Sequence, residues 1–139
     1  FNYACRRYGG RMAVHLGYSE ELAMQIYAGA DLFLMPSKSE PCGLSQMIAM
    51  RYGAVPIVRE TGGLKDTVHA YEAWNGQGNG FTFANYNAGD MCYVICEAID
   101  LYHNNKDAYA ALQKRGMTAD FSWTRSAQEY RRIYESICR

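Results

Sequence analysis

Two short apolar runs constrain the fold of this chain more than any other feature. Residues 31–35 read Asp-Leu-Phe-Leu-Met, and residues 54–58 read Ala-Val-Pro-Ile-Val. Short, nearly continuous apolar runs are typical of parallel strands that are buried on both faces. A loop and a helix fit between them, with the helix expected over 42–52 and Gly53 as its stop. The pattern predicts a strand–helix–strand unit.

The neighbouring segments extend this alternation of strands and helices. Ser19 can cap a helix whose expected face carries Leu22, Ile26 and Gly29. We also expect strands over 11–16 and 80–83, a turn at 61–63 leading into a helix over 64–68, and a surface loop over 74–80. The predicted fold class is therefore α/β: one domain with a Rossmann-like parallel sheet and flanking helices.

The last third of the chain is predicted to be helical, over 90–103, 106–119 and 123–138. In the first of these helices, apolar side chains share one face at Cys92, Ile95, Cys96 and Ile99. In the last helix the repeat of Tyr130, Ile133, Tyr134 and Ile137 is typical of a face that packs on a core.

Charge and cysteine content exclude several classes of function. Lys plus Arg equals Asp plus Glu, at 14 each, so net charge indicates neither nucleic acid nor an acidic membrane as partner. No apolar run approaches the roughly 20 residues of a membrane span. The five cysteines form no CxxC motif and favour reduced thiols in a cytoplasm. No metal-binding constellation is evident.

Three loops follow expected strands and hold most of the candidate functional residues: 17–19, 37–43 and 60–63. Ligands of open parallel sheets bind beyond the carboxyl ends of the strands, so we expect these loops to form a site. Tyr18 in the first loop could stack on a base, although a lone loop tyrosine is more often structural. The Gly62-Gly63 turn is weak evidence by itself.

The middle loop gives the strongest signal, because it runs directly into a helix. Backbone amides around Gly43 would point at an anion, and the helix dipole would favour a diphosphate there. Glu40 precedes this point and could accept hydrogen bonds from two sugar hydroxyls. Alternatively, Glu40 merely caps the helix, and spacing alone weighs the two readings equally.

Several strings in collinear order resemble the bacterial glycogen synthase and plant starch synthase family. Shorter matches are His15-Leu-Gly-Tyr-Ser19, Ala30-Asp31, Tyr52-Gly53, Pro56 and Asp120-Phe-Ser-Trp123. The most specific are Ser39-Glu-Pro-Cys-Gly-Leu-Ser-Gln46 and Arg59-Glu-Thr-Gly-Gly-Leu-Lys-Asp-Thr-Val68. The resemblance implies a GT-B fold and transfer of glucose from ADP-glucose to the non-reducing end of an α-1,4-glucan, with retention and without a metal or other cofactor.

The resemblance also implies roles for individual residues. Glu40 matches the active-site glutamate that contacts the transferred glucose. Cys42, Gly43, Leu44 and Ser45 match the segment that touches the glucose and the distal phosphate. Gly17 and Tyr18 match the position against the adenine, and Thr61, Gly62 and Gly63 match a loop lining the cleft. Ile48 stands where many related transferases carry a second glutamate, so no carboxylate pair is expected.

The resemblance further implies that this chain is a piece of a C-terminal donor-binding domain. The family's phosphate-binding Arg and Lys and its N-terminal acceptor domain lie upstream of the matched strings, and the chain does not begin with Met. We expect the piece alone to be inactive, because catalysis needs both halves of the cleft. Exposed strand edges and helix faces should also make it self-associate.

Two other functions stay open at the level of sequence. The chain could be a non-catalytic module that binds a nucleotide or a glucan, with some of its 12 tyrosines stacking on sugars. It could also belong to a related transferase that uses another nucleotide sugar, because the strings do not encode the base.

Overall fold

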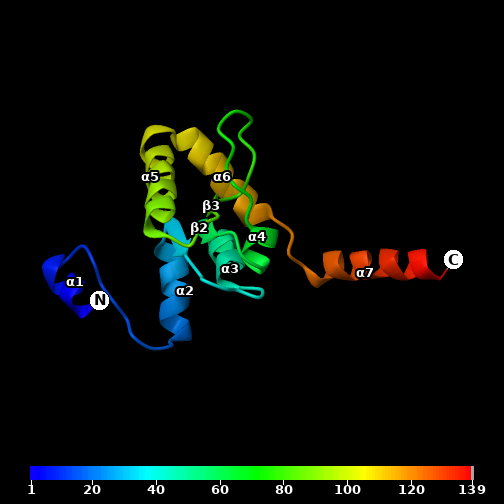
Figure 1. The fold of residues 1–139 in the computed structure, drawn as a ribbon, viewed down its shortest axis with the longest axis horizontal. Coiled ribbons are helices and arrows are strands. Elements are labelled where there is room, and N and C mark those ends of the chain that lie inside the picture. The colour runs from blue at the N-terminus through cyan, green and yellow to red at the C-terminus, as the bar shows by residue number, and fades with distance from the viewer. Residues whose placement is uncertain (139) are drawn as a thin grey trace.

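The computed structural model describes residues 1–138 and shows a small α/β body with helical extensions at both ends (Figure 1). The sheet has three strands. In chain order the elements are α1 (Asn2–Arg7), α2 (Glu20–Gly29), β1 (Leu32–Met35), α3 (Ser45–Tyr52), β2 (Val55–Arg59), α4 (Gly63–Thr67), β3 (Phe81–Phe83), α5 (Ala88–Asn104), α6 (Lys106–Thr118) and α7 (Trp123–Ile137).

The three strands are parallel and lie in the order β1-β2-β3, so the predicted α/β class is confirmed. Helices cover both faces of the sheet. On one face Val55 and Ile57 of β2 pack with α5 and α6 in the largest apolar cluster. On the other face Val58 packs with α3 and α4. The central strand is therefore buried on both sides, as its continuous apolar run predicts.

Local chemistry sets most of the helix ends. The Ser19 hydroxyl accepts a hydrogen bond from the Leu22 amide at 3.2 Å and starts α2. Asn87 caps α5 in the same way, through the Asp90 amide at 2.9 Å. Gly53 ends α3 with φ of 90°, a left-handed conformation that glycine adopts without a Cβ clash.

Two predictions about strands are wrong. Within the described chain, residues 12–16 form no strand, and α1 with its linker stands apart from the sheet (Figure 1). A strand needs a hydrogen-bonding neighbour, and in the described residues β1 pairs only with β2. The second wrong prediction is that β1 is buried on both faces. Because β1 has a strand neighbour on one side only, it is an edge strand, and its Leu34 is 41% exposed.

The helix over 42–52 begins later than predicted, at Ser45. The apolar faces expected for two other helices also differ from the sides that pack on the body. In α2 the sheet side carries Ala23, Met24 and Tyr27, while Ile26 is exposed. In α5 it carries Val94 and Ala98, so Cys92, Cys96 and Ile99 face solvent.

The last helix departs furthest from expectation. Its length is as predicted, but none of the described residues of α7 is buried. An extended segment separates α7 from the body (Figure 1). The apolar repeat Tyr130, Ile133, Tyr134 and Ile137 is therefore a face without a partner rather than part of this core.

Candidate active site at the carboxyl edge of the sheet

The loops that leave the three parallel strands all lie at one edge of the sheet. Residues 36–44 follow β1, residues 60–62 follow β2, and residues 84–87 follow β3. Because the strands are parallel, their carboxyl ends share this edge, which is where ligands of open α/β sheets bind. The first two loops contain most of the predicted site residues.

The loop after β1 packs tightly on the Gly62-Gly63 turn. The Gly63 amide donates a hydrogen bond to the Pro41 carbonyl at 3.3 Å. A Cβ on Gly62 would overlap the Glu40 carbonyl oxygen, and one on Gly63 would overlap the Cys42 carbonyl oxygen. Gly62 also has φ of 46°, which disfavours a side chain. The glycine pair is therefore needed for two predicted segments to meet.

The Gln46 side chain holds the part of the same loop that leads into α3. Gln46 is fully buried, and its amide nitrogen donates to the carbonyls of Cys42 at 3.3 Å and Gly43 at 2.9 Å. It also donates to the Thr67 hydroxyl, which donates in turn to the Gly63 carbonyl at 2.6 Å. One network thus joins the start of α3 to α4.

The backbone before α3 offers free donors. Gly43 has φ of 72°, and no side chain caps the helix at Leu44. Among the described residues, the amides of Gly43, Leu44 and Ser45 donate to no backbone or side-chain acceptor. Free amides at a helix N-terminus have the chemistry that binds a phosphate.

Glu40 directly precedes the part of this loop that Gly63 and Gln46 hold. Its side chain is half-buried and forms no ion pair or hydrogen bond with any residue that the structure describes. Glu40 does not cap α3, because the N-cap residue is Leu44. A carboxylate held by its backbone but free at its oxygens can accept hydrogen bonds from a ligand.

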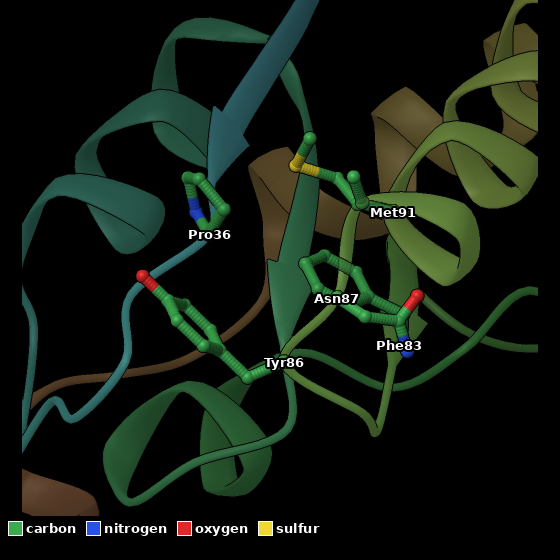
Figure 2. Close-up of a pocket in the computed structure, with 6 residues that line it drawn as sticks. Pro36, Phe83, Tyr86, Asn87 and Met91 are labelled. Carbon is green, nitrogen blue, oxygen red and sulfur yellow. The ribbon is translucent and has the colours of Figure 1, made fainter.

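A pocket of about 320 Å³ lies at the same edge, between the loops after β1 and β3 (Figure 2). It is lined by Pro36, Phe83, Tyr86, Asn87, Ala88 and Met91. Figure 2 shows the Tyr86 ring with its hydroxyl directed toward Pro36.

Beside this pocket, the Arg59 guanidinium lies 5.6 Å from the centre of the Tyr86 ring. Neither residue received a predicted role from the sequence, although Arg59 begins one of the matched strings. A sequence signal for Arg59 was available, because it is a charged residue at the end of an otherwise apolar strand.

The third predicted loop does not join the site. Tyr18 is 89% exposed, and within residues 1–138 it makes no hydrogen bond or ring contact with the other two loops. Gly17 has only His15 close to it. The expected convergence of three loops is therefore wrong for this chain, and the two loops that do meet are those after β1 and β2.

Two further properties of the described residues bear on function. Residues 1–138 contain no cluster of three His, Cys, Asp or Glu side chains with the geometry of a metal site. No helix in this part of the chain has the length and apolar character required to cross a membrane.

Comparison with known proteins gives a consistent result. The family described as glycosyl transferases group 1 matches residues 7–117. A glycogen synthase of Desulfitobacterium hafniense is 58% identical over 130 residues, which are 94% of this chain and 28% of that protein. A glycogen synthase of Bacillus cereus is 53% identical over 137 residues, which are 99% of this chain and 29% of that protein.

Two solved structures share the fold. The catalytic domain of starch synthase IV from Arabidopsis thaliana, bound to ADP and acarbose, matches with a TM-score of 0.78 and 42% identity. The match covers 89% of this chain and 26% of that one. Sucrose-phosphate synthase from Thermosynechococcus elongatus matches with a TM-score of 0.65 at 22% identity over 97% of this chain and 34% of that one.

Proposed function

The chain belongs to the glycosyl transferases group 1 family, and we propose that it is part of a glucosyltransferase that extends α-1,4-glucans from ADP-glucose. The named relatives support this assignment, since they are glycogen synthases at 58% and 53% identity. The starch synthase IV structure, which contains ADP and acarbose, supports a nucleoside diphosphate on the donor side and a glucan-like acceptor.

The observation that carries the proposal is the contact between the Glu40 loop and the Gly62-Gly63 turn. The Gly63 amide bonds the Pro41 carbonyl, and both glycines leave no room for a side chain. This contact fixes the backbone of the loop that carries both Glu40 and the free amides at the start of α3. A glycosyl diphosphate presents the matching groups, sugar hydroxyls next to a phosphate.

The proposed roles follow from these positions. The amides of Gly43, Leu44 and Ser45 bind the distal phosphate and stabilise the negative charge on the leaving diphosphate. Under this proposal the reaction does not require a metal ion for that stabilisation. Glu40 accepts hydrogen bonds from the glucose, and the Cys42 backbone lies alongside. Thr61, Gly62 and Gly63 line the cleft.

The adenine contact expected from Gly17 and Tyr18 belongs to the same proposal and requires those residues to approach the site. The chain spans 28% of the Desulfitobacterium relative and 29% of the Bacillus relative. We therefore propose that basic side chains for the diphosphate and the acceptor side of the cleft come from the rest of the protein. A bacterial cytoplasm suits the five free thiols, four of which are exposed.

The test is transfer of labelled glucose from ADP-glucose to glycogen by the full-length protein. We expect Glu40→Gln to lower kcat by at least about 100-fold, because the lost contacts act on the reacting sugar. Glu21→Gln, at an exposed position of α2, is the matched control and should stay within about twofold.

The outcomes separate the competing functions. ADP binding without transfer by the wild type would indicate a non-catalytic binding module. Faster transfer from UDP-glucose than from ADP-glucose would indicate a different donor. Full activity of the Glu40→Gln variant would remove the carboxylate from the mechanism.

A further inference from the structure

Arg59 joins two loops of the site that are far apart in the sequence. It is the last residue of β2, the central strand. Its Nη1 donates a hydrogen bond to the Lys38 carbonyl at 2.9 Å, in the loop after β1. Its guanidinium carbon lies 5.6 Å from the centre of the Tyr86 ring, in the loop after β3. A single side chain therefore connects all three strand ends.

The bond to Lys38 holds the part of the loop that precedes Glu40. Downstream of Glu40, the Gly63 amide holds the Pro41 carbonyl, and Gln46 holds the carbonyls of Cys42 and Gly43. Upstream of Glu40, within the described residues, the Arg59 bond to Lys38 is the side-chain bond that reaches the loop. Glu40 thus lies between two anchors, and Arg59 provides one of them.

The shape of the guanidinium matters for this contact. Its plane can lie over an aromatic ring while one edge donates to a carbonyl, which a lysine ammonium cannot reproduce. The Nε atom of Arg59 is buried and has no hydrogen-bond partner among residues 1–138. A buried donor without a partner carries a free-energy cost. The side chain is therefore held in place by Lys38 and Tyr86 despite this cost.

We propose that Arg59, held by Tyr86, is a positioning residue that sets the location of Glu40 in the site. This inference rests on the proposed function. Arg59 acts through the backbone of the loop and not on the substrate. Loss of its side chain leaves the phosphate-binding amides in place, because Gln46 and Gly63 hold that end. The defect should therefore fall on the chemical step more than on donor binding.

The experiment compares variants of the full-length protein in the glucose-transfer assay, with kcat, the KM for ADP-glucose and the thermal midpoint measured for each. We expect Arg59→Met to lower kcat by roughly 10- to 50-fold and to change KM by less than about threefold. Arg59→Lys should recover only part of the loss. Tyr86→Leu should also lower kcat, and Tyr86→Phe, which keeps the ring face, should lie closer to the wild type.

Arg51→Met is the matched control. Arg51 also donates from Nη1 to a backbone carbonyl, that of Met117 at 2.8 Å, but at the opposite end of α3 from the Glu40 loop. It should lower the thermal midpoint without lowering kcat. Equal effects of Arg51→Met and Arg59→Met on kcat would overturn the positioning role, and so would wild-type kcat in Arg59→Met.

Three further outcomes complete the test. If Arg59→Met does not fold, the Arg59→Lys and Tyr86→Leu variants decide the matter, since normal kcat in both would overturn the proposal. A wild type without transfer would overturn the proposed function and this inference together. An inactive Glu40→Gln variant beside a normal Arg59→Met variant would overturn this inference alone.

Discussion

The side-chain amide of Gln46 donates a hydrogen bond to the hydroxyl of Thr67, with 3.1 Å between Nε2 and Oγ1. This bond links the first turn of α3 to the last residue of α4, 21 positions later in the chain. Thr67 donates onward to the Gly63 carbonyl, and Gln46 also donates to the carbonyls of Cys42 and Gly43. A buried polar network thus fixes the relative position of the two loops that form the candidate site.

Replacing Gln46 by Leu should damage both stability and transfer. The substitution leaves the partly buried carbonyls of Cys42 and Gly43 without this donor, which costs up to about 1–3 kcal/mol. It also frees the Gly43 backbone, so the KM for ADP-glucose should rise. Gln113→Leu is the control, because Gln113 donates to the Gly53 carbonyl at 2.7 Å, away from the loop. Urea unfolding and transfer kinetics of the full-length variants measure both effects, and an unchanged KM in Gln46→Leu would contradict the expectation.

Replacing Gly63 by Ala should separate the two loops. A Cβ at this position would overlap the Cys42 carbonyl oxygen, which is backbone and cannot rotate away. We expect a stability loss of about 1–3 kcal/mol from this overpacking, together with loss of transfer. Gly29→Ala is the control, since nothing lies within 4 Å of its added Cβ at the end of α2. Thermal unfolding and transfer assays distinguish the variants. A fully active Gly63→Ala variant would show that close loop contact is not required.

Much of this site was accessible from sequence because it depends on local chemistry. The two apolar runs predicted the parallel strands, and the loops after those strands predicted the end of the sheet where the Pro41 carbonyl meets the Gly63 amide. The roles of Arg59 and Gln46 were not accessible, because each depends on contacts with residues about 20 positions away. A sequence pattern reports the face of an element but not the partner of a polar side chain.

Several errors in the fold share a physical origin. Residues 11–16 were predicted to form a strand and the apolar face of α7 to pack on a core, and both are partly or fully exposed. An apolar pattern indicates that a surface favours burial, but it does not identify what covers it. The open edge of β1 adds to this, since Leu34 is exposed where a neighbouring strand would cover it. The faces of α2 and α5 have a different cause: their partners lie in this chain, but the apolar repeat did not identify which side of each helix packs on the body.

The phenol of Tyr109 should make the chain less stable in alkali. Tyr109 is buried, and its hydroxyl donates to the Asp31 carbonyl at 2.6 Å. Burial, with a smaller contribution from Asp31, raises the pKa of this phenol above its ordinary value of 10.0. In the unfolded chain the phenol loses its proton as the pH passes 10, whereas in the folded chain it keeps it. Unfolding therefore becomes more favourable as the pH rises above about 10.

Tyr109→Phe isolates this effect. At neutral pH the variant should be less stable by about 1 kcal/mol, because the bond to Asp31 is lost. Between about pH 10 and 11 the difference should shrink, since phenylalanine has no proton to lose. Urea unfolding of both proteins at pH 7 to 11 measures the difference. A gap that stays constant over this range would contradict a raised pKa.

The exposed face of α7 should drive self-association of the 139-residue chain. Tyr130, Ile133, Tyr134 and Ile137 form a continuous apolar stripe on a helix in which no described residue is buried, and such a stripe favours burial against another surface. We expect the apparent mass in sedimentation to rise with concentration. The double variant Ile133→Glu with Ile137→Glu should shift the chain toward the monomer by at least about tenfold in dissociation constant, because two charges would have to be desolvated. Gln128→Glu adds a charge on the opposite face and should leave the association unchanged. A wild-type chain that stays monomeric at high concentration would contradict this expectation.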